Sequence, residues 1–90
     1  MRFEWNARKA AANVRKHGVS FDEAASVFLD SLSATGDDPD HSLDERRFVT
    51  FSNSSSGRLL VVAHVHLDDV VRIITARLAT RAERKLYEEG

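Results

Sequence analysis

The sequence predicts a small α+β domain in which a small antiparallel sheet packs on two N-terminal helices and carries a C-terminal helix. Three observations support this class: apolar residues at helical spacing after residue 20, three Val-, Phe- and Leu-rich segments between residues 46 and 76, and a helix-capping sequence at residues 80–83. The expected order of elements is β-α-α-β-β-β-β-α. Ninety residues allow one domain, spanning 1–90, with a modest core.

The first expected elements are a short strand and a helix. Polar and apolar side chains alternate over Arg2–Trp5, as they do in a half-buried strand. Asn6 is a favourable N-cap residue, and Gly18 suits the left-handed conformation that often ends a helix. We therefore expect a helix from Ala7 to His17.

A second helix is expected after Ser20, because Ser20 and Glu23 have the spacing of a capping box. Its core-facing stripe, at i, i+3, i+4, i+7 and i+8, consists of Phe21, Ala24, Ala25, Phe28 and Leu29. A short strand near Leu32–Thr35 and an exposed acidic loop around Pro39, the only proline, are expected next.

Three strands and a helix complete the predicted fold. Segments Arg46–Ser52 and Arg58–His66 are rich in β-forming residues, and the five polar or small residues between them suit a hairpin. The nearly continuous apolar stretch Val70–Ala76 predicts a central strand buried on both faces. Thr80 and Glu83 form a second capping box, which opens a helix that reaches residue 89.

Composition excludes several classes of protein. No apolar run approaches the roughly eighteen residues of a membrane span, and the N-terminal residues lack the apolar core of a signal peptide. Cysteine is absent, which excludes disulfides, thiolate metal sites and a cysteine nucleophile. We therefore expect a cytoplasmic protein that does not associate with a membrane.

The net charge of −1 argues against a domain that is basic throughout, yet the charges are segregated along the chain. One stretch is acidic without basic neighbours and contains Asp37, Asp38, Asp40, Asp44 and Glu45. Beyond Val70 basic residues dominate, namely Arg72, Arg77, Arg81, Arg84 and Lys85. A basic end can steer an anion toward one face, although a solvated charged surface without a ligand explains the same pattern.

Five blocks of sequence, separated along the chain, carry a family resemblance. They are F-E-W-N at 3–6, N-x-x-K-H-G-V-S-F-D-E-A at 13–24, V-F-L-D at 27–30, G-R-L-L-V-V at 57–62 and R-I-I-T-A-R-L-A-T-R-A-E-R-K-L-Y-E at 72–88. In this order the blocks resemble the BrnT family of toxins from bacterial type II toxin–antitoxin pairs. The resemblance covers nearly the whole chain, which makes it far more specific than a single motif.

The resemblance implies a fold similar to that of the RelE ribonucleases, and a toxin that cleaves RNA and inhibits translation and growth. It also implies neutralisation by a BrnA-like antitoxin, a ribbon-helix-helix DNA-binding protein, in a heterotetramer that contacts operator DNA only through the antitoxin. No cofactor is expected. Relatives commonly have R-I-I-S-A-R-K-A-T where this chain has Thr75 and Leu78.

Arg72 and Arg77 are the candidates for gripping the scissile phosphate. RNA scission without a metal ion needs a base for the 2′-hydroxyl proton, cations for the phosphorane charge and an acid for the leaving oxygen. A guanidinium group suits the second task because it binds two phosphate oxygens at once. Residues five apart on an ideal strand point to opposite faces, so one site requires the strand to end or twist near Thr75. The structural alternative is an ion pair of either arginine with Asp68, Asp69 or Glu45.

Two further residues complete the candidate catalytic set. Tyr87 is a candidate for hydrogen bonding to a phosphate or stacking on a base, or for covering the core. Arg46 lies at the entrance to a strand, where it can face the site. The candidate RNA-binding cations lie on the first and last helices and are Arg81, Arg84, Lys85, Lys9 and Lys16. A solvated helix face explains the last-helix cations equally well, and antitoxin binding is the alternative for the two lysines.

No residue stands out as the general base. His41, His64 and His66 titrate in the useful range. His64 and His66 share one face of a strand, which is a plausible metal spacing, but no motif places a third ligand, so we expect no metal site.

A rival interpretation is a degenerate toxin that acts without catalysis, as an interaction module and co-repressor with its antitoxin. Leu78, which interrupts the basic series, and the negative net charge favour it. Growth after expression without antitoxin separates the two, since a lethal protein rescued by Arg72→Ala is an enzyme.

Overall fold

The computed structural model describes residues 1–38 and 46–89. Its elements are β1 (Arg2–Glu4), α1 (Ala7–His17), α2 (Phe21–Ser26), the 3₁₀ helix η1 (Val27–Leu29), β2 (Ala34–Asp37), β3 (Arg47–Asn53), β4 (Leu59–Leu67), β5 (Val70–Leu78) and α3 (Arg81–Glu89). The predicted α+β class is confirmed. Most of the predicted acidic loop, with His41 and Glu45, lies outside the described residues.

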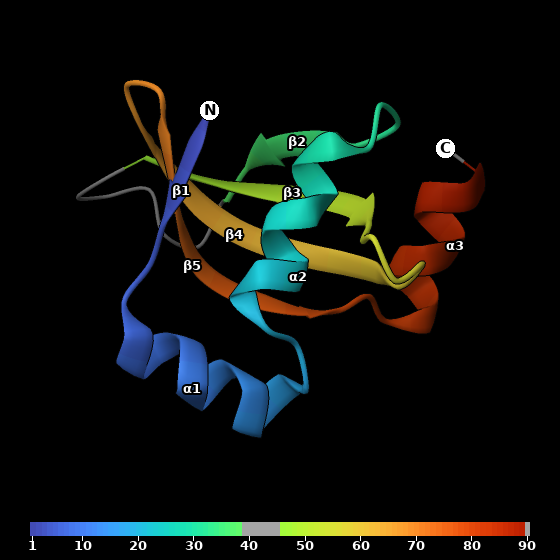
Figure 1. The fold of residues 1–90 in the computed structure, drawn as a ribbon. Coiled ribbons are helices and arrows are strands. Elements are labelled where there is room, and N and C mark those ends of the chain that lie inside the picture. Colours follow the sequence, from blue (N-terminus) through green and yellow to red (C-terminus); the bar gives the residue numbers. More distant parts are fainter. Residues whose placement is uncertain (39–45, 90) are drawn as a thin grey trace.

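The five strands form one sheet in the order β1-β5-β4-β3-β2 (Figure 1). Strands β2 to β5 pair antiparallel with their neighbours, whereas β1 pairs with β5 in parallel. The predicted antiparallel sheet is therefore wrong at this edge, and the sheet is mixed. A hairpin forces antiparallel pairing only on consecutive strands, and β1 reaches β5 from the other end of the chain.

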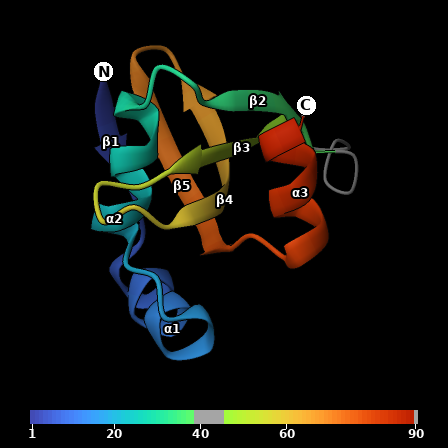
Figure 2. The same cartoon turned by 90° about the vertical axis from the view of Figure 1, so that its right-hand side faces the viewer.

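Helices lie on both sides of this sheet. Figure 2 shows α2 on one side and α3 on the other, while α1 lies along β5. We call the side of α2 the core face and the side of α3 the outer face. The main core lies between α2 and the core face and consists of Val19, Phe21, Ala24, Val27, Leu60, Val62, Ile73 and Ala76. Burial of this apolar surface, at roughly 25 cal/mol per Å², is the chief source of stability.

The start of α1 follows the prediction, and its middle is fixed to β5. The Asn6 side chain accepts hydrogen bonds from two backbone N–H groups of the first turn, at 2.9 and 3.1 Å, and Gly18 ends the helix with φ of 69°. Asn13 is buried and pairs with both backbone groups of Ala76, donating to its carbonyl at 2.8 Å and accepting from its N–H at 3.2 Å. Its side chain thus acts as the edge partner of β5 beyond the end of β1.

The second helix is shorter than predicted. It ends at Ser26, and the tighter 3₁₀ turn that follows breaks the helical spacing. Leu29 is consequently 86% exposed, so its predicted place in the core is wrong. Strand β2 also begins two residues later than the predicted Leu32–Thr35.

Glu23 closes only half of its predicted capping box. Its N–H donates to Ser20 Oγ at 3.0 Å, but its carboxylate binds Arg58, Ser54 and Ser56 at the hairpin between β3 and β4. The hydrogen bond from Arg58 is the main reason that the pKa of Glu23 is lowered to about 2. This cluster holds α2 against the end of the sheet. Among the described residues, no helix is long and apolar enough to cross a membrane.

Candidate functional site

Strand β5 contains an irregularity that changes which side chains share a face. On β4, Ala63 lies opposite Thr75, but the next residue, His64, lies opposite Ile73. Ile74 is therefore an extra residue on β5, as in a β-bulge. Because side chains alternate with a period of two, one extra residue reverses their alternation along the strand.

The bulge brings Arg72 and Arg77 to the same face. Arg72 lies opposite Val65 and Arg77 opposite Val61, and two β4 residues four apart point to one side of the sheet. Both arginines thus belong to the outer face, where Arg72 is exposed. The prediction that β5 is buried on both faces is wrong, because α3 covers only part of the outer face. The four-residue separation places the two arginines roughly 13 Å apart along the strand.

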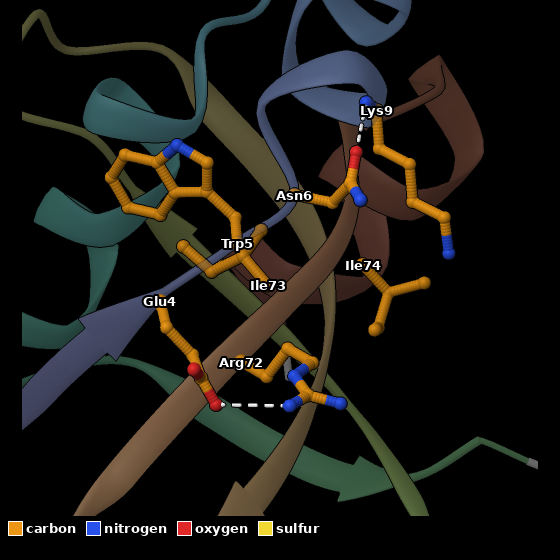
Figure 3. A pocket seen from close by; sticks show the side chains of 7 residues that line it. All are labelled: Glu4, Trp5, Asn6, Lys9, Arg72, Ile73 and Ile74. Atoms are coloured by element: carbon orange, nitrogen blue, oxygen red, sulfur yellow. Dashed lines mark hydrogen bonds and ion pairs between the residues drawn. The ribbon is translucent and has the colours of Figure 1, made fainter.

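Arg72 borders a pocket of about 310 Å³ at the edge of the sheet, where β1 runs into α1 (Figure 3). The pocket is lined by Glu4, Trp5, Asn6, Lys9, Arg72, Ile73 and Ile74. Arg72 Nη2 lies 3.2 Å from Glu4 Oε1, and both side chains are nearly half exposed. Two cations and one carboxylate from three different elements therefore share one accessible pocket.

The chain direction around this pocket follows from local contacts. Parallel pairing places Glu4 directly opposite Arg72. Trp5 then packs edge-on against Phe21, with ring centroids 6.0 Å apart. The N-cap residue that follows starts α1, whose first turn carries Lys9 to the pocket. The turn between β1 and α1, fixed by these contacts, thus positions both flanking charges.

Arg77 is engaged elsewhere. Its guanidinium donates two hydrogen bonds to Glu83, at 2.7 and 2.9 Å. Glu83 also accepts from the Thr80 N–H at 2.9 Å and donates its own N–H to Thr80 Oγ1 at 3.1 Å, which confirms the predicted capping box. Hydrogen bonding from Arg77 is the main cause that lowers the pKa of Glu83 to about 2. The two β5 arginines thus pair with Glu4 and Glu83 in the structure.

Two other predicted catalytic residues are not gathered at the pocket. The Tyr87 hydroxyl donates to the Leu32 carbonyl at 3.0 Å, and burial, followed by the charge of Asp30, raises the pKa of Tyr87. Arg46 pairs with Asp37 at 3.1 Å. Its guanidinium also lies 5.1 Å from the centre of the Phe48 ring, whose other neighbours are core-face rings.

Sequence reasoning missed Arg47, the neighbour of Arg46. Arg47 lies opposite Val65 on β4, and Arg72 lies opposite the same residue from the other side. Arg47 and Arg72 therefore share the outer face, two strand spacings or roughly 10 Å apart. Successive side chains along a strand point to opposite faces, so Arg46 and Arg47 differ only in the face that each occupies. Which of the two lies on the outer face depends on the exact register of β3, which the sequence does not show.

The helix cations fall into two groups. Lys9 and Lys16 lie two turns apart on α1, on the side of the buried Asn13 that binds β5, so Lys16 continues the basic surface away from the pocket. Arg81, Arg84 and Lys85 are exposed on α3, at the opposite end of the molecule from the pocket (Figure 1). They do not line the pocket.

Neither His64 nor His66, the two candidate histidines among the described residues, lies at the pocket. His64 is fully buried on the core face, where its Nε2 lies 2.7 Å from Thr50 Oγ1 and its ring packs edge-on against Phe28. Burial, followed by the charge of His66, lowers the pKa of His64 to about 4. His66 lies on the same face of β4 as His64, as predicted, and the centroids of the two rings are 4.9 Å apart. In residues 1–38 and 46–89, no three potential ligands cluster to hold a metal ion.

Glu4 is the second functional candidate that sequence reasoning missed. It is the carboxylate nearest to Arg72 at the pocket. The only signal for it is the pairing of two strands almost seventy residues apart, which sequence periodicity does not reveal.

The fold and the pocket define a small α+β protein in which two cations and one carboxylate share an accessible pocket at the sheet edge. The chain belongs to the BrnT family: the model for the ribonuclease toxin BrnT of type II toxin–antitoxin systems matches residues 5–83. This range includes Lys9 and Arg72, while Glu4 immediately precedes it. The predicted family is therefore confirmed, and with it a ribonuclease toxin that has an antitoxin partner.

A solved structure shows the same fold. The chain is similar to the 1.1 Å crystal structure of the Brucella abortus ribonuclease toxin BrnT, with a TM-score of 0.66 and 17% sequence identity. The match covers 90% of this chain and 99% of the Brucella chain. No curated protein sequence gives a significant match.

Proposed function

We propose that the pocket lined by Glu4, Lys9 and Arg72 cleaves RNA without a metal ion, by attack of a ribose 2′-hydroxyl on the adjacent phosphate. The observation that carries this proposal is the convergence of one carboxylate and two cations on a single pocket. The new bond joins the 2′-oxygen to phosphorus, and the bond to the 5′-oxygen breaks. The products are a 2′,3′-cyclic phosphate and a 5′-hydroxyl end.

Each side chain has a role that its chemistry allows. Glu4 accepts the proton of the 2′-hydroxyl. Arg72 binds the non-bridging oxygens and offsets the charge that develops on the phosphorane, because its five donors serve Glu4 and phosphate together. Lys9 faces the same pocket from α1 and supplies the proton or the charge that the leaving 5′-oxygen needs.

The RNA backbone runs from this pocket along the neighbouring basic residues. Lys16 extends the α1 side of the path, and Arg47 extends it across the outer face. Arg77 has donors left for a phosphate beyond its pair with Glu83. These contacts fit a single strand, whose successive phosphates can each meet one of these cations.

In the cell, this activity acts in the cytoplasm, inhibits translation and growth, and is neutralised by a BrnA-like ribbon-helix-helix antitoxin in a heterotetramer. The family match supports an antitoxin as the partner of this chain. The sequence blocks at 3–30 and 57–88 support the particular partner.

Incubation of the purified chain with RNA in EDTA tests the chemistry. We expect fragments with cyclic phosphate ends, and a loss of rate of about 10²- to 10⁴-fold for Glu4→Gln and Arg72→Ala. Arg8→Ala is the matched control for Lys9→Ala, because both residues are exposed on the first turn of α1 and only Lys9 lines the pocket. Intact RNA, or cleavage only after a divalent metal is added, would refute the mechanism. Intact RNA together with harmless expression would favour the non-catalytic co-repressor.

A further inference from the structure

A second hollow, of about 250 Å³, lies between α3 and the sheet. It is lined mainly by apolar side chains, and its residues are Ala34, Phe51, Glu83, Leu86 and Tyr87. None of these lines the Arg72 pocket, which lies where β1 meets α1. Figure 1 shows α3 and the β1–α1 junction at opposite ends of the molecule.

Two small residues of β2 lie beside this hollow, and one of them, Ala34, lines it. Ala34 lies opposite Phe51 and Gly36 opposite Val49, so both β2 residues belong to the outer face. A methyl group and a hydrogen atom leave the neighbouring Phe51 and Val49 only half-buried. An atom added at the Cβ position of Gly36 meets nothing within 4 Å, which shows that the space beside it is open.

The hollow adjoins an open strand edge. Strand β2 is the last strand of the sheet formed by the described residues, so its outer N–H and C=O groups have no strand partner there. Such an edge is a template for another extended chain. A strand added along β2 would place alternate side chains beside Ala34 and Gly36, over the hollow.

Exposed leucines surround the same place. Leu32 is 75% exposed and Leu86 is 73% exposed, and the Tyr87 hydroxyl joins their two segments by its bond to the Leu32 carbonyl. Scattered exposed leucines are ordinary, but exposed apolar side chains beside an apolar hollow mark an interaction site. Three α3 cations accompany it and make no ion pair with any described residue: Arg81, Arg84 and Lys85.

We infer that an extended, acidic and apolar segment of the antitoxin adds a strand to β2 and fills the hollow under α3. Apolar side chains of the segment cover Phe51 and Leu86, and its carboxylates face the α3 cations. A second copy of this chain fits less well, because a two-fold contact would bring the same cations together. RNA would leave the leucines uncovered. The inference rests on the antitoxin partner of the family and not on the proposed cleavage chemistry.

Two variants test this site with the cognate antitoxin, co-expressed with the chain and measured as the purified pair. Leu86→Glu places a charge on the apolar surface, and Ala34→Leu fills the hollow that Ala34 lines. We expect each to weaken antitoxin binding at least tenfold. Val14→Glu is the matched control, because Val14 is an apolar residue of α1 that is 48% exposed and lies away from the hollow. We expect this variant to bind the antitoxin as tightly as the wild type does.

Amide hydrogen exchange of the wild-type complex gives a second, independent measurement. We expect new protection at residues 34–37 when the antitoxin binds. Protection confined to α1 and the Arg72 pocket, or Leu86→Glu binding as tightly as the wild type, would overturn the proposal. So would a dimer of the isolated chain that Leu86→Glu dissociates, since the occupant would then be a second copy. RNA cleavage by the free Leu86→Glu chain should be unchanged, and a wild type that does not cleave RNA would refute only the mechanism.

Discussion

Single residues decide which side chains meet in this protein. Ile74 reverses the alternation of β5, and this one extra residue puts Arg72 and Arg77 on a common face. The same parity argument places Arg47 on the same face as Arg72, whereas Arg46 pairs with Asp37. A difference of one position in a strand therefore separates an outer-face cation from one that serves an ion pair.

His64 makes folding stability depend on pH. Its pKa is about 4 in the folded state against 6.5 when unfolded, so the unfolded chain binds the proton more tightly. Stability is therefore complete above pH 6.5 and falls as the pH drops toward 4, by roughly 3 kcal/mol in total. The carboxylates of Glu23 and Glu83, with pKa values of about 2, lose their contributions only below pH 4.5.

Between pH 6.5 and 4.5, the change in stability therefore comes from His64 and not from these two acids. The free energy of unfolding, measured with urea at several pH values in this range, shows the effect. We expect His64→Gln to flatten the pH dependence there, whatever its absolute stability. His66→Gln removes only the smaller of the two causes of the lowered pKa of His64, so it should keep most of the wild-type slope. An unchanged slope in His64→Gln would show that another group is responsible.

Among the elements, α3 depends on few interactions. It has no buried residue, and its start is held by Glu83, which binds Arg77 and the Thr80 N–H together. Tyr87 adds one hydrogen bond near its end. A helix of nine residues is marginal in water, so these anchors decide whether it stays folded.

Replacing Glu83 by Ala should loosen α3 without unfolding the sheet. The change removes the ion pair and half of the capping box, each worth about 1 kcal/mol. We expect amide exchange over residues 81–89 to accelerate roughly tenfold or more, while β4 amides keep their protection. Glu88→Ala is the control on the same helix. Equal acceleration in both variants would mean that Glu83 is no special anchor.

Local signals predicted most elements, and pairing between distant strands accounts for what they missed. Asn6, Gly18 and the Thr80–Glu83 capping box act within a few residues of themselves, so their effect is visible in sequence. The parallel contact of Glu4 with Arg72 and the bulge at Ile74 depend on register across the sheet. The candidate site was therefore predicted in its cations but not in its carboxylate.

At the scale of the whole molecule, a net charge of −1 hides a basic strip along α1 and β5. The strip includes Lys9, Lys16 and Arg72, and α3 carries its own cations at the opposite end of the molecule. A polyanion responds to the local field of such a strip more than to the total charge. The salt dependence of RNA binding can therefore show which group of cations the RNA contacts.

Each phosphate contact on a single strand contributes about 0.7 to the slope of log affinity against log salt concentration. With an uncleavable 2′-O-methyl RNA, we expect Lys9→Ala and Lys16→Ala each to lower the slope by about that amount. Arg84→Ala on α3 and Arg8→Ala on the first turn of α1 should leave it unchanged. A slope that falls in Arg84→Ala but not in Lys16→Ala would place the RNA over α3. That outcome would also support the prediction, made from charge alone, that the α3 cations bind RNA.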